Sequence, residues 1–174
     1  DIFRLGRPPK EGHELSKDME DYLFTNLLDM QCGSFMAQTS DELCSRKGVK
    51  RQDADAFAVI SHTRTASSID SGLFDEEIVS VKTPDGIVGP KDEDHVVRGT
   101  NEESLSGLRA AFGPDSLVTA GNASGVVDGA AALVIKSATQ AENDGDSPLA
   151  KIISWGIVGI EPAIMAYGPV PSSL

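Results

Sequence analysis

The sequence has few cysteines, and this limits the kinds of site it can carry. There are two in 174 residues, Cys32 and Cys44. They do not form a Cys-x-x-Cys pair and no histidine follows at zinc-ligand spacing, so we expect neither a metal site nor a disulfide framework. Sparse cysteine is typical of reducing compartments. We therefore expect an intracellular protein, with cytoplasmic, mitochondrial or peroxisomal location left open.

Basic charge and long apolar runs are also scarce. Fifteen basic residues stand against 27 acidic ones, which gives a formal net charge of −12. A protein whose main partner is a nucleic-acid backbone needs a basic face, so we expect no nucleic-acid partner. Apolar runs fall short of the roughly 20 residues that a membrane-spanning helix needs. We therefore expect no membrane role, and the acidic residues are interpreted as a solvated surface.

Common catalytic fingerprints are missing as well. The sequence has no phosphate-binding P-loop, no Gly-x-Ser-x-Gly elbow, no His-Glu-x-x-His and no Rossmann glycine pattern. His62 falls on a predicted polar helix face, which favours a surface role over a catalytic one. Cys44 falls inside a predicted helix and is more typical of a core position. Cys32 precedes a glycine in a predicted loop, but no neighbouring base is evident.

What is present indicates a globular α/β chain. Its length suits one domain, or a domain and a piece of another. A start at Asp1 without methionine is typical of an excised or processed piece. Residues 1–17, rich in proline, glycine and charge, predict an irregular segment. The remaining chain alternates helical and strand-like patterns.

Two helices are predicted in the first half. One begins at Thr39 or Ser40, with acidic residues in its first turn and basic residues before Gly48, in the polarity that a helix dipole favours. The second runs from about Gln52 to Asp70 and ends at Gly72. Its predicted apolar stripe consists of Phe57, Ile60 and Ile69.

The second half mixes shorter elements. Residues 74–88 predict a hairpin around the turn Pro84-Asp85-Gly86, and residues 100–112 predict a short capped helix. Residues 141–148 read as a helix end and loop, 149–159 as a strand, and 161–171 as a loop.

The stretch "VTAGNASGVVDGAAALVIKS", residues 118–137, stands out within this acidic chain. It contains three glycines at four-residue spacing, the tripeptide Asn122-Ala123-Ser124 and an apolar run from Ala130 to Ile135. The tripeptide matches a glycosylation sequon, which we interpret as a chance match that requires another explanation. Periodicity leaves the apolar run open as a strand buried on both faces or as a helix.

Four blocks together resemble the middle of a thiolase. They are "RQDADAFAVISHTRTASSIDSGLFDEEIVSV", "RGTNEESLSGLRAAF", "SLVTAGNASGVVDGAAALVIKS" and "LAKIISWGIVGIEPAIMAYGPVP". Their order and spacing are similar to those of the family over most of residues 20–172. The last block looks more like the short-chain, acetoacetyl-CoA branch.

The resemblance implies an acyl-CoA C-acyltransferase, active in fatty acid metabolism, that exchanges 3-ketoacyl-CoA and CoA with acetyl-CoA and a shortened acyl-CoA. In the family a cysteine takes the acyl group, and the matching motifs lie outside the blocks found here. We therefore expect no catalytic residue and no metal ligand in this segment, including Cys32 and Cys44. The implied partners are CoA and acyl-CoA thioesters as substrates, and a homodimer, homotetramer or complementary thiolase fragments. The alternative is a truncated, non-catalytic CoA-binding or assembly module.

The same resemblance implies a partial thiolase-like fold. Residues 18–115 correspond to the loop domain that covers CoA, and 116–137 to the end of the N-terminal core half, with a buried strand. Residues 138–174 correspond to a linker and the start of the C-terminal core half, while 1–17 stay unassigned.

The implied ligand contacts centre on the turn "AGNASG". Ser124 would hydrogen-bond an amide of the pantetheine arm, and the small residues Ala120, Gly121 and Ala123 would let that arm approach the backbone. Further expected CoA or substrate contacts are Met36, Phe35, Arg98, Ser104, Ala111, Phe112 and Met165. Phe35-Met36-Ala37 departs from the family's His-Met-Gly, which loses an imidazole beside the pantetheine.

Overall fold

The computed structural model describes residues 25–89, 96–125, 127 and 129–174. Residues 1–17, and the part of the predicted loop domain before residue 25, lie outside the described residues. Helices dominate the described chain, together with two small antiparallel sheets. The elements are, in order, β1 (Leu28–Asp29), β2 (Ser34–Phe35), α2 (Met36–Lys47), α3 (Arg51–Asp70), β3 (Val81–Thr83), β4 (Gly86–Val88), α4 (Glu102–Ser106), α5 (Ala138–Asp144), the 3-10 helix η1 (Pro162–Tyr167) and α6 (Pro169–Ser172).

Helix α2 confirms the first predicted helix, but it begins earlier than expected. The side chain of Gln38 accepts the backbone N–H of Phe35 at 2.9 Å and so closes the first turn. Thr39, predicted as a cap, is instead a buried helical residue whose hydroxyl donates to Met36 O at 2.7 Å. Gly48 ends the helix as predicted, at φ 71°, in the left-handed region that glycine adopts without strain.

Helix α3 agrees with the second predicted helix to within one residue. Asp53 caps it by accepting the N–H of Lys50 at 2.8 Å. The predicted apolar stripe was wrong: Ile69 is buried, but Phe57 is 72% and Ile60 is 47% exposed. The buried face of α3 is partly polar, because it also holds the carboxylate of Asp55.

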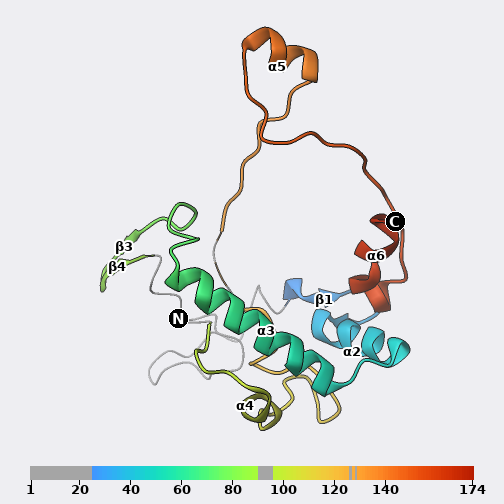
Figure 1. Cartoon of the computed structure of the whole chain (residues 1–174). Coiled ribbons are helices and arrows are strands. Elements are labelled where there is room, and N and C mark those ends of the chain that lie inside the picture. Colours follow the sequence, from blue (N-terminus) through green and yellow to red (C-terminus); the bar gives the residue numbers. More distant parts are fainter. Residues whose placement is uncertain (1–24, 90–95, 126, 128) are drawn as a thin grey trace.

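The predicted hairpin is confirmed as β3 and β4, with Val81 opposite Val88 and Thr83 opposite Gly86. Proline suits the first loop position because its fixed φ matches a tight turn. The helix predicted over residues 100–112 is shorter than expected, since α4 is only five residues long. It packs against α3 beneath it (Figure 1).

The end of the chain packs on α2. Residues 161–171, predicted as a loop, instead form η1 and α6, and η1 lies against α2. Arg46 of α2 donates two hydrogen bonds to the carboxylate of Glu161, at 2.6 and 2.7 Å, and Lys47 lies 4.2 Å from the ring centre of Tyr167. These contacts tie segments about a hundred residues apart in sequence.

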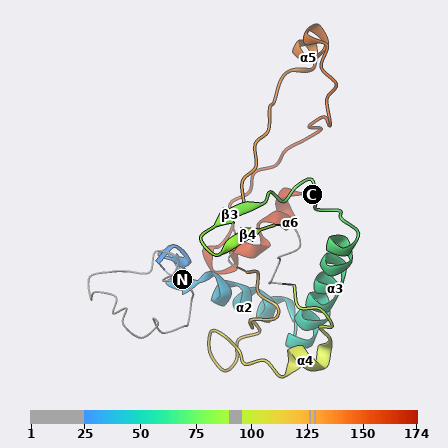
Figure 2. The same ribbon diagram turned by 90° about the vertical axis from the view of Figure 1, so that its left-hand side faces the viewer.

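Two predicted strands are not formed. Residues 130–135 and 149–159 have no regular secondary structure and run as extended arms that carry α5 away from the body, as both views show (Figures 1 and 2). Their apolar side chains are exposed, including Val134 at 89% and Trp155 at 81%. Lys136 pairs with Asp144 and Asp146 and closes the base of the α5 loop. Within the described residues, no helix is long and apolar enough to cross a bilayer.

Candidate functional site

The first part of the stretch that stands out in the sequence, residues 118–124, forms a tight turn docked on α3 and α4. Ala110 bridges Thr119, and the N–H of Ala111 donates to Val118 O at 2.8 Å. The N–H groups of Asn122 and Ala123 then both point back to Thr119 O, at 3.3 and 3.0 Å. Thr119 is fully buried. The backbone of this turn is therefore held by its own hydrogen bonds.

The side chain of Asn122 locks the turn from within. Its carbonyl oxygen accepts the N–H of Thr119 at 2.8 Å, and its amide donates to Leu117 O at 2.8 Å and to the carboxylate of Asp55 at 3.0 Å. Every polar atom of the side chain is thus engaged inside the protein. The sequon therefore has a structural explanation, because an amide used in this way closes a turn.

Asp55 connects the turn to the helices. It is 3% exposed, and its second oxygen accepts from Nε of Arg51 at 2.8 Å. Arg51 also donates to the carbonyls of Leu105 and Leu108, at 2.7 and 3.2 Å. A buried carboxylate is tolerated only when it is paired and hydrogen-bonded, and this one has both an arginine and an amide.

Gly121 lies where the turn meets α4. A methyl group added at its Cα would lie 2.4 Å from Cδ2 of Leu105 and 2.6 Å from Cδ1 of Leu108. Packing against these leucines therefore explains this glycine without a ligand. Its neighbours Ala120, Ala123 and Ser124 are exposed, so they form the accessible edge of the turn.

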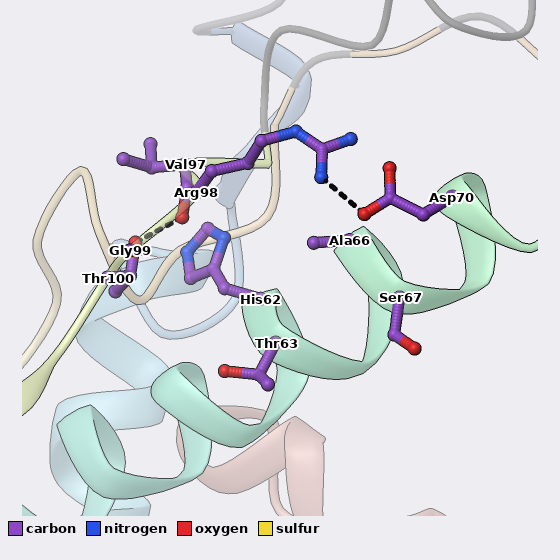
Figure 3. Close-up of a pocket in the computed structure, with 9 residues that line it drawn as sticks. All are labelled: His62, Thr63, Ala66, Ser67, Asp70, Val97, Arg98, Gly99 and Thr100. Atoms are coloured by element: carbon purple, nitrogen blue, oxygen red, sulfur yellow. Dashed lines mark hydrogen bonds and ion pairs between the residues drawn. The ribbon is translucent and has the colours of Figure 1, made fainter.

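His62 joins the turn to an adjacent groove. Its Nε2 lies 3.1 Å from Gly121 O. A carbonyl oxygen only accepts, so Nε2 carries the proton. The ring is half-buried. The groove has a volume of about 430 Å³. Figure 3 shows its lining, which consists of His62, Thr63, Ala66, Ser67, Asp70, Val97, Arg98, Gly99 and Thr100.

Arg98 enters this groove from the segment that precedes α4. Gly99, at φ 76°, and a hydrogen bond from the Thr100 hydroxyl to Val97 O turn the chain there. The guanidinium of Arg98 lies over the end of α3 and donates to Asp70 at 2.8 Å. The predicted contact residue Ser104 does not line the groove. Its hydroxyl donates to Asn101 O at 2.8 Å in the cap of α4.

Five predicted contacts remain, and two of them form an aromatic pair. The rings of Phe35 and Phe112 have centroids 6.4 Å apart at 40°, so the structure brings these two together. Met36 begins α2, and Met165 lies 43% exposed in η1, which packs on that helix. Ala111 is exposed.

A second groove of about 650 Å³ opens beside these residues. Its lining includes Cys32, Ser34, Gln38, Phe112, Pro114 and Ala163. Phe112 thus contributes both to this groove and to the aromatic contact with Phe35.

Cys44 lies half-buried within α2. Burial raises the pKa of the Cys44 thiol, and the nearby charge of Asp41 raises it further. This disfavours the thiolate, which is the nucleophilic form of cysteine. No group of three or more His, Cys, Asp or Glu side chains that could hold a metal occurs among the described residues.

Sequence reasoning missed four residues that organise the site: Asp55, Asn122, His62 and Asp70. Only Asn122 gave a signal, as part of a sequon without an evident purpose. The others lie on α3 and meet partners 28 to 67 residues away, a distance that helix periodicity does not encode.

Residues 9–139 match the model of the thiolase N-terminal domain. The match extends over more than half of the chain, so the chain belongs to the thiolase family.

Individual thiolases resemble this chain in sequence and in structure. An acetyl-CoA acetyltransferase of Allochromatium vinosum is 40% identical over 141 residues, which covers 79% of this chain and 36% of the relative. The crystal structure of the Bacillus anthracis acetyl-CoA acetyltransferase superposes with a TM-score of 0.80 at 33% identity, covering 93% of this chain and 42% of the other. Human mitochondrial 3-ketoacyl-CoA thiolase in complex with CoA gives 0.78 at 32% identity, covering 96% and 42%. The chain thus spans about two fifths of these relatives, and its partial thiolase-like α/β fold is confirmed.

Proposed function

We propose that this chain is the CoA-binding part of a thiolase, within an enzyme that condenses two acetyl-CoA molecules or thiolyses a 3-ketoacyl-CoA. The observation that carries the proposal is the turn at residues 119–124. Its backbone is fixed by Asn122 and Asp55, while Ala120, Ala123 and Ser124 remain accessible. A solved relative holds CoA, which supports this ligand class.

A fixed turn with small exposed side chains suits the pantetheine arm of CoA. That arm is narrow and bears amides, so it gains most from a backbone it can approach and from one or two hydrogen-bonding groups. We propose that the hydroxyl of Ser124 meets one of these amides. Because the turn is already ordered by its own contacts, little conformational entropy is lost there on binding.

The two grooves suit the two ends of an acyl-CoA molecule. The groove with Arg98 offers a guanidinium, which suits the phosphates at the nucleotide end. The second groove offers Phe112 next to Phe35, with Met36 and Met165 on the elements beside it, which suits an apolar acyl group. Ser104 is proposed to act through the cap of α4 or at the ligand's edge. Ala111 is proposed to contribute apolar surface along the acyl tunnel.

We expect the acyl-accepting cysteine to come from thiolase polypeptide other than these 174 residues. Cys44 is unsuited to this role because its thiol pKa is raised. The chain alone is therefore expected to bind CoA without cleaving acetoacetyl-CoA. Measurable thiolysis by the purified chain would contradict this expectation.

The test is calorimetric titration of CoA into the chain. Ser124→Trp should abolish binding, because the indole would occupy the accessible edge of the turn. Ser147→Trp is the matched control, since this serine is also exposed but lies in the loop after α5. Equal CoA affinity in the wild type and in both variants would refute the proposed contact surface.

A second candidate is an assembly module that does not catalyse. The exposed apolar side chains on the two arms favour it, because surfaces of this kind mark protein contacts. The occupants would be a second copy, in a dimer or tetramer, or complementary thiolase fragments. Native mass spectrometry with and without CoA distinguishes the candidates: self-association without CoA binding supports assembly alone. A role in fatty acid metabolism follows only if the chain works within a complete thiolase.

A further inference from the structure

The groove beside the turn contains one opposed pair of charges. Among its nine lining residues Arg98 and Asp70 are the two charged side chains, and His62 is the third that can titrate. Nη1 of Arg98 lies 2.8 Å from Oδ2 of Asp70. The side chains are 56% and 63% exposed, so the pair lies at the open face of the groove.

The position of Asp70 explains why this pair forms. Asp70 is the last residue of α3, and the last turn of that helix contains no basic residue. The C-terminal end of a helix carries partial negative charge, which repels a carboxylate. Arg98, 28 residues further along the chain, supplies the missing positive charge. The guanidinium of Arg98 therefore already has a hydrogen-bond acceptor at the C-terminal end of α3 before any ligand binds.

We propose that Asp70 limits the affinity of this groove for phosphate groups by holding Arg98 in an ion pair that competes with the ligand. This rests on the proposed function, in which the nucleotide end of CoA reaches Arg98. Asp70 accepts from Nη1 of Arg98 alone. An incoming phosphate that approaches this edge of the guanidinium competes with Asp70 for Nη1, and it also meets the negative charge of the carboxylate. The groove thus admits a phosphorylated ligand at a reduced affinity that one side chain sets.

The expected size of the effect follows from the exposure of the pair. Exposed ion pairs are weak, and their strength corresponds to about a 2- to 5-fold change in a binding constant. Asp70→Asn frees Arg98 and removes one negative charge, so CoA should bind about 2- to 5-fold more tightly. Pantetheine, which has no phosphate, should bind the variant and the wild type equally.

The experiment is calorimetry on the full chain with CoA and with pantetheine, at low and high salt. Asp85→Asn is the matched control, because it removes the same charge from an exposed turn of the hairpin outside the groove. Only Asp70→Asn should tighten CoA binding, and the gain should shrink at high salt as exposed charges are screened. Thermal unfolding of each variant verifies that all are folded.

Other outcomes overturn the proposal in distinguishable ways. If Arg98→Ala weakens CoA binding while Asp70→Asn leaves it unchanged or weaker, Asp70 is not a competitor and the CoA site stands. If Asp70→Asn tightens pantetheine as much as CoA, the effect comes from a change in the turn and not from phosphate competition. If the wild type binds neither CoA nor pantetheine, the proposed function fails and this inference fails with it.

Discussion

Adding a methyl group at Gly121 tests whether the turn depends on its contact with α4. The two leucine methyl carbons would lie 2.4 and 2.6 Å from the new Cβ. Carbon atoms at best contact are about 3.5–4.0 Å apart, so both contacts are short by roughly 1 Å. Leu105 is 4% exposed and has little room to move. Gly121→Ala must therefore push the turn away from α4 or force Leu105 out of its rotamer.

The expected cost is that of overpacking, about 1–3 kcal/mol in the free energy of unfolding. Urea unfolding followed by circular dichroism measures it as a lower midpoint with an unchanged slope. CoA titration of the folded variant reports on the turn itself, and binding should weaken because the accessible edge moves with the backbone.

Gly129→Ala provides the control. It belongs to the same glycine series, but an added Cβ there meets nothing within 4 Å. Its expected effect is neutral or stabilising by about 0.4–1 kcal/mol, through the lower entropy of the unfolded chain. If Gly121→Ala costs no more than Gly129→Ala, the close contact of the turn with Leu105 and Leu108 is wrong, and with it the structural reason for this glycine.

Two further predictions concern ion pairs of different burial. Asp55→Ala should cost about 3 kcal/mol in unfolding free energy, the low end for a broken buried pair, because Arg51 keeps some exposure. Asp85→Ala, at an exposed position in the hairpin turn, should cost much less, and equal losses would refute the buried network. The pair between Glu161 and Arg46 should respond to acid: hydrogen bonds from Arg46 lower the pKa of Glu161, so its contribution is present above the unfolded pKa and is lost as pH falls through the folded value. After correction for the intrinsic slowing of amide exchange in acid, the protection of the amides in residues 161–172 should fall in acid for the wild type and show no such step in Glu161→Gln.

The helices were predictable because their signals are local. Gly48 and Gly72 end α2 and α3 where the sequence places them, since a glycine at positive φ is required at each position. The start of α2 was not predictable. The capping contact comes from Gln38, while Thr39 and Ser40, the better capping residues by type, both donate to Met36 O inside the helix. Local propensity decides where a helix can begin, and competing side-chain bonds decide where it does.

The arms show why strand patterns are harder to interpret. Residues 130–135 and 149–159 have the apolar composition of buried strands, yet in the described chain they pair with nothing. A strand needs a partner for its backbone hydrogen bonds, and the partner is not a property of the segment itself. The composition of these segments indicates a high strand propensity. Whether they form a sheet depends on a partner strand, which the segments themselves do not specify.

The two parts of the candidate site differ in how firmly their contacts hold them. The turn is fixed by a nearly fully buried carboxylate and an amide whose bonds all stay inside the protein, so its accessible edge has one shape before ligand arrives. The proposed acyl side depends on η1 lying against α2, and Arg46 and Glu161, the ion pair between these elements, are 40% and 51% exposed. Exposed pairs contribute little and are screened by salt. The proposed pantetheine contact is therefore the rigid half of the candidate site, and the proposed acyl groove is the half whose shape can adjust.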